Sequence, residues 1–344
     1  MNKIIKTAKD LIKFKSITGN SKEIDKCLKY IIDFYKDDKI ILQKFKYNKI
    51  KSILISLKSK NPKIILHGHI DVVPVFSNKQ FLPIVKNNKL YGRGSNDMKT
   101  AVAVMMHVLK DLNKLDIGLL ITTDEEVGGY NGAYFLSKIL KPEFIISGEI
   151  TDLYIGNQAK GVLQFELTIP GKIAHSAKPW EGINPIDKLG ELISEVKKIN
   201  TSKKEYYTTI TITKANSGIA TNQIPPDCKI FCDMRYIPKD NPNKFIKRLS
   251  KFGKINITAK ADYAYCDPNN KYIQELLTIM KNNKIKSKTF NKHAASDVRH
   301  FTEKNIPGIV FGPKGNCPHT KNEYVDVTSI KPYYNILKEF CKNK

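Results

Sequence analysis

Short, nearly continuous runs of Ile, Leu and Val constrain the fold of this 344-residue chain more than any other feature. The runs are ILISL at 53–57, KIILHGH at 63–69, GLLITT at 118–123, FIISGE at 144–149 and IPGIVFG at 306–312. Segments with helical periodicity, such as 100–112, separate them. Runs of this length are typical of strands that are buried on both faces of a sheet. We therefore predict an α/β fold with a mixed, mostly parallel sheet.

The pattern changes between residues 161 and 266, where polar and apolar residues alternate along a first strand, VLQFELTI. A helix, two strands, a second helix and a further strand are predicted to follow it. Two β-α-β units in this order are typical of a small α+β domain of the ferredoxin-like type. A chain of 344 residues is also longer than one hydrophobic core usually fills. We therefore predict a domain at 161–266 that is inserted into a larger domain formed by 1–160 and 267–344.

Polar side chains follow directly on four of the predicted strands. They are His69 and Asp71, then Asp124, Glu125 and Glu126, then Glu149, and finally His319. In open α/β sheets the ligand crevice lies at the carboxyl ends of the strands. We therefore expect these four segments to converge on one pocket. His67 is expected to be turned away from His69 by the alternation of the strand and to pack in the core.

Histidines and carboxylates in one pocket are the ligand types that Zn²⁺ prefers. A two-metal hydrolytic site also needs a carboxylate that bridges the ions, and Asp97, in a glycine-containing loop before a helix, is the candidate. Asp71 lies close enough in sequence to accept the second imidazole N–H of His69 and fix its tautomer. Of the adjacent Glu125 and Glu126, one can bind metal while the other acts as general base on a metal-bound water.

The ordered motifs resemble those of the two-zinc deacylases and exopeptidases, a family that includes succinyl-diaminopimelate desuccinylase, acetylornithine deacetylase and glutamate carboxypeptidase. The resemblance extends from about residue 8 to the end of the chain. It is carried by HGHIDVVP, LYGRGSNDMK, TTDEEVGG, SGE, PGKIAHSAKPWEGINPI, NQIPPDCKIFCDMR, SDVRHF and His319 with NEYVDV. As an ordered set these motifs are specific for the family, but they do not specify a substrate.

The resemblance implies two Zn²⁺ ions per subunit, with Co²⁺ or Mn²⁺ as alternatives. His69, Asp97 and Glu149 would surround one ion, and Asp97, Glu126 and His319 the other. The resemblance makes Glu125 the general base and Asp71 the residue that orients His69. It also implies a cis peptide bond after Asp97.

The resemblance implies that the insertion at 161–266 is a lid through which two copies dimerise. His175 would reach the active site of the partner copy and stabilise the oxyanion. Asn222 and Arg235 would bind the carboxylate of the substrate, a role that suits a bidentate guanidinium. Ser296 and Arg299, in SDVRHF, are further candidates for substrate contacts, and a structural role for Arg299 stays open.

The predicted reaction is metal-dependent hydrolysis of the amide bond of an N-acyl amino acid, of the desuccinylase or deacetylase type. A zinc carboxypeptidase or dipeptidase of the same family is the alternative. HAASD stands where the desuccinylases have GGTSD, and Lys160 replaces an Arg before Gly161. Because of these departures from the family pattern, the identity of the acyl group that is removed stays open.

The composition bears on partners and location. The chain has 58 basic and 33 acidic residues, a net charge of +25, which raises a distant alternative: an inactive hydrolase scaffold that binds polyanions. The Lys residues are spread along the whole chain, so we expect a small-molecule substrate and neither a nucleic-acid nor a membrane partner. The six cysteines form no C-x-x-C pair, and the amino terminus is interrupted by Lys, so we expect a cytoplasmic protein.

Overall fold

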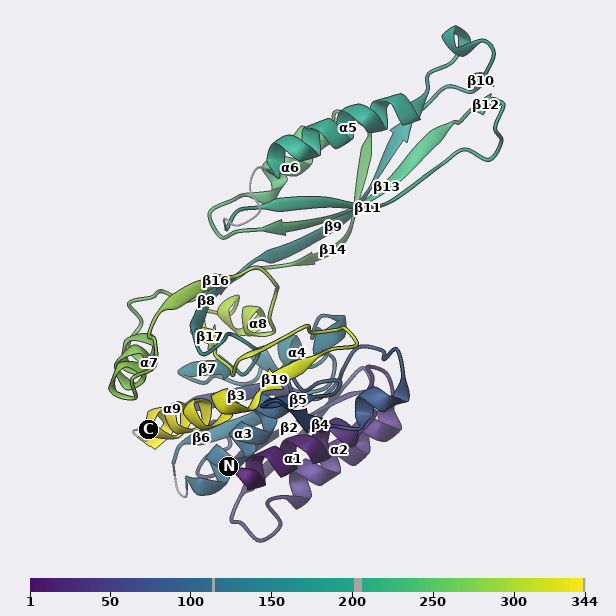
Figure 1. Ribbon diagram of the computed structural model, residues 1–344. Coiled ribbons are helices and arrows are strands. Elements are labelled where there is room, and N and C mark those ends of the chain that lie inside the picture. The colour runs from purple at the N-terminus through teal and green to yellow at the C-terminus, as the bar shows by residue number, and fades with distance from the viewer. Residues whose placement is uncertain (113–114, 201–205, 343) are drawn as a thin grey trace. The chain divides into compact units, whose positions relative to one another are not determined.

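The computed structural model describes residues 1–112, 115–200, 206–342 and 344, and the chain divides into two units (Figure 1). Unit 1 comprises Met1–Gln158, Ala264–Phe290 and Ser296–Lys344, and unit 2 comprises Ala159–Tyr263 with Asn291–Ala295. The insertion predicted at 161–266 therefore overlaps unit 2 over nearly its whole length. Among the described residues, no helix combines the length and the hydrophobicity that crossing a lipid bilayer requires.

A nine-stranded sheet forms the centre of unit 1. Its order is β1-β2-β6-β3-β7-β17-β8-β15, and β16 pairs with β8. The strands are β1 (Ile41–Tyr47), β2 (Ile50–Ser56), β3 (Ile64–His69), β6 (Ile117–Thr122), β7 (Phe144–Ser147), β8 (Ile155–Ala159), β15 (Ala264–Tyr265), β16 (Thr289–Lys292) and β17 (Gly308–Val310). The four central strands β6, β3, β7 and β17 run parallel to one another, and β1, β2 and β8 pair antiparallel. The predicted mixed, mostly parallel sheet is confirmed.

Helices cover this sheet and complete the core of unit 1. They are α1 (Asn2–Lys13), α2 (Ser21–Asp33), α3 (Lys99–Asp111), α4 (Ala133–Ser137), α7 (Lys271–Asn282), α8 (Val298–Thr302) and α9 (Ile330–Lys342). Alternate residues of β3 and β6, such as Ile64, Leu66 and Leu119, share one hydrophobic cluster with α1, α3 and α9. Helix α1 presents a stripe at helical spacing to this cluster, from Ile4 through Ala8 to Leu11.

A smaller sheet and three single turns complete unit 1. The sheet has the order β18-β19-β5-β4, with strands Gly315–Asn316, Tyr324–Asp326, Lys89–Tyr91 and Ile84–Lys86. The 3₁₀ turns are η1 (Asn78–Phe81), η2 (Glu125–Val127) and η4 (Val327–Ser329). Strand β5 ends directly before the loop that carries Asp97, and helix α3 begins directly after it. The small sheet and α3 therefore hold the two ends of this loop.

Unit 2 has the element order β-α-β-β-α-β. The elements are β9 (Gly161–Pro170), α5 (Pro185–Ile199), β11 (Thr209–Ser217), β13 (Asp227–Tyr236), α6 (Pro242–Leu249) and β14 (Lys254–Ala261). The strands form an antiparallel sheet in the order β11-β13-β9-β14, the arrangement of the predicted ferredoxin-like domain. Alternate residues of β9, Leu163, Phe165 and Leu167, pack against Leu192 and Val196 of α5.

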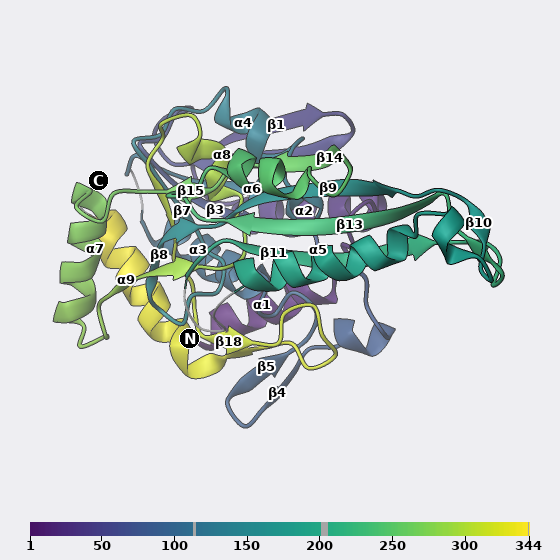
Figure 2. The ribbon, with the colours of Figure 1, turned by 90° about the horizontal axis from the view of Figure 1, so that it is seen from above.

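One end of unit 2 carries an extension formed by a separate two-stranded sheet. Strand β10 (Ala174–His175) pairs with β12 (Gln223–Ile224), and the turn η3 (Pro179–Glu181) lies beside them in sequence. Figure 1 shows β10 and β12 together at this end, and Figure 2 shows β10 beyond the end of α5. The extension therefore separates His175 from the other end of the sheet.

Candidate functional site

The carboxyl ends of three parallel strands bring polar residues together in unit 1. Strand β3 ends at His69, β6 leads into η2 with Glu125 and Glu126, and β7 is followed by Glu149. Because β6, β3 and β7 are parallel neighbours, these ends lie at one edge of the sheet. The expectation drawn from strand positions alone corresponds to this arrangement.

Asp97 lies between two imidazoles. Its Oδ1 is 3.0 Å from Nε2 of His69, and its Oδ2 is 3.3 Å from Nε2 of His319. Nε2 of His319 is also 3.1 Å from Oε2 of Glu126. Each oxygen of the Asp97 carboxylate therefore faces a different histidine, as a bridging carboxylate does.

The contacts of His69 test whether a cation fits between these groups. Its Nδ1 lies 3.0 Å from the main-chain oxygen of Asp71, which can only accept, so the ring hydrogen belongs on Nδ1. The remaining Nε2 then directs a lone pair at an oxygen of Asp97, which repels it unless a cation or a proton stands between them. The residues present therefore fit a cation at this position.

The group of Asp97, Glu126 and His319 offers the same donor chemistry. One ligand atom from each lies within 4.8 Å of the others. Oε1 of Glu126 is buried and has no hydrogen-bond partner among the described residues. The carboxylates of Asp97 and Glu126 raise the pKa of His319 to about 10. The same negative charge that would hold a proton on this ring attracts a divalent cation.

The carboxylate of Asp71 has a different task from the one predicted. Its Oδ1 is 3.5 Å from Nδ1 of His69, farther than the main-chain oxygen of the same residue. Its two oxygens instead accept the main-chain N–H groups of Glu125 and Glu126, each at 3.2 Å, and the hydroxyl of Thr18 at 2.9 Å. Asp71 therefore fixes the turn that carries both glutamates, and Thr18, which the sequence did not indicate, holds Asp71.

The side chain of Glu125 is nearly buried and lies beside His69. Its Oε2 is 3.9 Å from Nε2 of His69. Burial raises the pKa of Glu125 well above its usual value, and the charges of Asp297 and Glu149 act in the same direction. Gly128 and Gly129, with φ of 104° and 66°, adopt left-handed backbone conformations that close the turn behind it. A carboxyl group with a raised pKa beside a cation site suits proton transfer.

Glu149 lies outside the close group of three and is held by Ser296. The Ser296 hydroxyl donates to Oε1 of Glu149 at 2.6 Å, and Ser296 is fully buried. The neighbouring Arg299 is 4% exposed, and its Nη2 donates to the main-chain oxygen of Gly128 at 2.7 Å. Of the two residues that SDVRHF nominated for substrate contacts, one thus orients Glu149 and the other supports the turn after Glu126.

A buried ion pair braces the loop that carries Asp97. Nη1 of Arg93 lies 2.5 Å from Oε2 of Glu323, and each side chain is 1% exposed. The other oxygen of Glu323 accepts the main-chain N–H groups of Asn96 at 3.0 Å and Asp97 at 3.2 Å. The cis peptide bond that the resemblance implies is present between Asp97 and Met98. Glu323 belongs to NEYVDV, but nothing in that motif indicates its contact with Arg93.

The predicted direction of His67 was wrong. His67 and His69 are two residues apart in β3, so their side chains lie on the same face of the sheet. His67 nevertheless packs in the core, as predicted, with its ring nitrogens 3.3 Å from the Ser147 hydroxyl and 3.1 Å from the Thr122 hydroxyl. Burial lowers the pKa of His67 to about 3, so the ring is neutral.

The remaining predicted residues lie in unit 2. His175 pairs with Gln223 across β10 and β12, and the N–H of Ser176 donates to the main-chain oxygen of Asn222 at 2.9 Å. Arg235 lies near the opposite end of β13, where its Nε and Nη2 contact Asp233 at 2.6 and 3.1 Å. Eight residues of strand, roughly 26 Å, separate Arg235 from the start of β13, and Asn222 lies beyond that point. Within unit 2 the structure places His175 and Asn222 together but not with Arg235.

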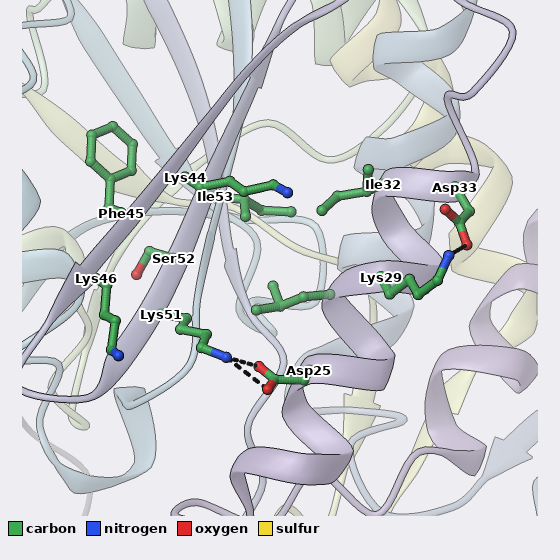
Figure 3. Close-up of a pocket in the computed structure, with 11 residues that line it drawn as sticks. Asp25, Lys29, Ile32, Asp33, Lys44, Phe45, Lys46, Lys51, Ser52 and Ile53 are labelled. Atoms are coloured by element: carbon green, nitrogen blue, oxygen red, sulfur yellow. Dashed lines mark hydrogen bonds and ion pairs between the residues drawn. The ribbon is translucent and has the colours of Figure 1, made fainter.

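A pocket of about 580 Å³ in unit 1 contains none of the predicted site residues (Figure 3). It lies between α2 and the strands β1 and β2, over apolar side chains that include Ile32 and Ile53. At its rim, Lys51 pairs with Asp25 at 2.7 Å and Lys29 with Asp33 at 2.6 Å. Because none of the histidines and carboxylates that carry the predicted chemistry lines this pocket, it is not the candidate site.

The family model described as peptidase family M20/M25/M40 matches residues 65–343. A succinyl-diaminopimelate desuccinylase from Pelagibacter ubique is 33% identical over 98% of both chains. An acetylornithine deacetylase from Buchnera aphidicola is 27% identical over 98% of this chain and 97% of its own.

Solved structures share the fold at lower identity. A tripeptidase from Staphylococcus aureus has a TM-score of 0.83 at 22% identity, covering 99% of this chain and 98% of its own. A metallo-carboxypeptidase from Sulfolobus solfataricus has a TM-score of 0.79 at 19% identity, with 99% of both chains covered. A dinuclear metal-binding peptidase from Bacillus subtilis has a TM-score of 0.70 at 15% identity, covering 99% and 97%.

Proposed function

Because the chain belongs to peptidase family M20/M25/M40, we propose that it hydrolyses the amide bond of an N-acyl amino acid with two divalent metal ions per subunit. The observation that carries this proposal is Asp97, whose two carboxylate oxygens face the imidazoles of His69 and His319. His69, Asp97 and Glu149 would hold one ion, and Asp97, Glu126 and His319 the other. Zn²⁺ is the proposed metal, with Co²⁺ or Mn²⁺ as alternatives.

The reaction needs a general base and a proton donor for the leaving amine. When bound, two such ions would lower the pKa of a water and polarise the scissile carbonyl. Glu125 would take the proton of that water and pass it to the amine, a role supported by its burial and its position 3.9 Å from His69. Asp71 would keep Glu125 in place through the N–H that it accepts.

Unit 2 would complete the site as a lid through which two copies dimerise. We propose that His175 of one copy stabilises the oxyanion in the other copy, and that Asn222 and Arg235 bind the substrate carboxylate. The separation of Asn222 from Arg235 along β13 supports a site to which two copies contribute, because one small substrate cannot reach both in a single copy. The proposed location is the cytoplasm, which suits six free cysteines, five of them buried.

The deacylase reaction is favoured by the 33% identity to a desuccinylase along the whole chain. The alternative, a carboxypeptidase or dipeptidase, is favoured by the peptidases among the structures that share the fold. The polyanion-binding alternative does not account for Asp97 between two imidazoles, or for the buried oxygen of Glu126 that has no partner in the part of the chain that the structure describes.

Turnover of N-succinyl-diaminopimelate, N-acetylornithine and a panel of dipeptides tests the proposal, with the protein reconstituted with Zn²⁺ and its metal content measured. We expect two ions per chain, hydrolysis of one acylated amino acid, and loss of that activity after chelation. Dipeptide hydrolysis alone would favour the alternative. A protein that holds two ions and cleaves none of these compounds, or one that binds polyanions in a salt-sensitive way without metal, would contradict the proposal.

A further inference from the structure

Lys160 is a buried residue of unit 2 whose ammonium group has no acidic partner among the described residues. The residue is 2% exposed, directly before β9. Among the described residues, no carboxylate lies within ion-pair distance of its Nζ, which instead lies 5.6 Å from the ring centre of Tyr206 and 5.5 Å from that of Tyr207. Cation–π contacts at this distance offset only part of the cost of burying an ammonium group. Burial and the nearby Arg235 lower the pKa of Lys160, as expected where a counter-ion is missing.

A second hydrogen-bond donor lies beside Lys160. The hydroxyl of Tyr206 is buried and has no hydrogen-bond partner among the described residues. Burial raises the pKa of Tyr206 to about 12, so the hydroxyl keeps its proton and can donate it to an anion. The ring of His293 packs edge-on against Tyr206, with 5.6 Å between the ring centres. The two donors therefore stand in a partly aromatic environment, where a charge-assisted hydrogen bond is strong.

The nearby Arg235 differs from Lys160 because its charge is already matched. Its Nε and Nη2 bind both oxygens of Asp233, and Gln164 also donates to Asp233 at 2.9 Å. Lys160 and Arg235 contribute two positive charges and Asp233 one negative charge, so this group of three has one positive charge in excess. One carboxylate from a ligand would balance it.

We propose that Lys160 and Tyr206 form a carboxylate-binding site in unit 2, with Arg235 as a neighbouring cation and Tyr207 and His293 as its aromatic wall. The inference rests on the proposed function and narrows its substrate class, because it requires a substrate carboxylate that is bound away from the metal ions. That carboxylate belongs either to the acyl group or to the amino acid. In both cases Lys160 determines specificity and takes no part in proton transfer.

Steady-state kinetics of a Lys160→Met variant, loaded with Zn²⁺, test this site. We expect KM to rise about tenfold or more, as for the loss of a hydrogen bond to a charged group, with kcat within about threefold of wild type. A Lys160→Arg variant, which keeps the cation, should stay within about threefold in KM. Lys229→Met is the matched control, because Lys229 is exposed on β13 and its loss removes the same charge from unit 2.

The two substrates distinguish the source of the carboxylate. A KM increase for N-succinyl-diaminopimelate alone assigns it to the acyl group, since the acetyl group has none. An equal increase for N-acetylornithine assigns it to the amino acid. Unchanged KM for every hydrolysed substrate in a folded Lys160→Met protein would overturn the site. If that variant does not fold, Tyr206→Phe decides: a KM increase of about threefold supports the site, and an unchanged KM overturns it.

Binding of succinate separates failure of this site from failure of the proposed reaction. Calorimetry on the metal-loaded protein should show binding to wild type that is about tenfold weaker in Lys160→Met and unchanged in Lys229→Met. If no compound is hydrolysed, the proposed reaction fails, but this difference would still support the carboxylate site. Succinate held only by the metal ions would bind wild type and Lys160→Met equally, which would overturn the site.

Discussion

The two units of this chain arrange their candidate functional residues in opposite ways. In unit 1, parallel strands place their carboxyl ends at one edge, so that His69, Asp97, Glu126 and His319, which are spread over 250 positions of sequence, meet within hydrogen-bonding distances. In unit 2, His175 lies on the short strand β10 beyond one end of the antiparallel sheet, and Arg235 lies near the other end. The parallel sheet thus brings its candidate site residues together within one copy of the chain. The antiparallel sheet keeps its candidate residues at opposite ends, so that a site at either end needs further residues packed against it.

The first prediction concerns the ion pair that braces the Asp97 loop of unit 1. Replacing Arg93 by Met leaves Glu323 buried without its partner, and breaking such a pair costs about 3–5 kcal/mol of unfolding free energy. Denaturant unfolding followed by circular dichroism measures the loss. The control is Arg248→Met, which removes the part-exposed pair with Glu195 in unit 2 and should cost much less, because solvent screens an exposed ion pair. Equal losses of unfolding free energy in the two variants would show that the buried Arg93–Glu323 pair stabilises the protein no more than a part-exposed pair does.

The second prediction concerns the proton acceptor of unit 1. Glu125→Ala should retain both metal ions and lose at least about 100-fold in kcat, the usual contribution of a general base. Turnover and metal content are measured on the same preparation. Glu126→Ala, one residue away, should instead lose metal. Near-normal turnover in Glu125→Ala would refute the role of Glu125.

The third prediction concerns unit 2 and has the smallest expected effect. Glu125→Ala and His175→Ala are mixed at equal concentration and allowed to exchange subunits, each variant alone being nearly inactive. If His175 acts on the partner copy, activity should recover to about a quarter of wild type, because half of the dimers are mixed and each has one intact site. Mixed dimers without any recovery would place His175 in the site of its own copy.

The sequence predicted the centre of the fold because buried strands leave a strong signal. The apolar runs at 63–69 and 144–149 correspond to β3 and β7, and the helix expected at 100–112 is α3. Strand β1 was not predicted, because its apolar residues are interrupted by Lys44 and Lys46 on a half-exposed edge. The edge of a sheet is determined by pairing with a neighbour, which a single segment does not reveal.

The candidate site was predictable to the extent that its residues follow strands. The positions of His69 and Glu125 relative to strand ends carried that signal, and order along the chain carried the rest. The contact of Arg93 with Glu323 joins residues 230 positions apart and leaves no pattern in either segment. Likewise, nothing near Lys160 in sequence indicates that Tyr206 lies beside it, because the strands β9 and β10 and the helix α5 intervene.

The length of β13 has a consequence for how the enzyme would behave in dilute solution. If Asn222 and Arg235 bind one substrate as proposed, their separation by most of the length of β13 means that a complete substrate site would exist only while two chains are associated. Mass action then regulates turnover: the rate per chain would decline on dilution below the dissociation constant, although every chain remained folded and metal-loaded.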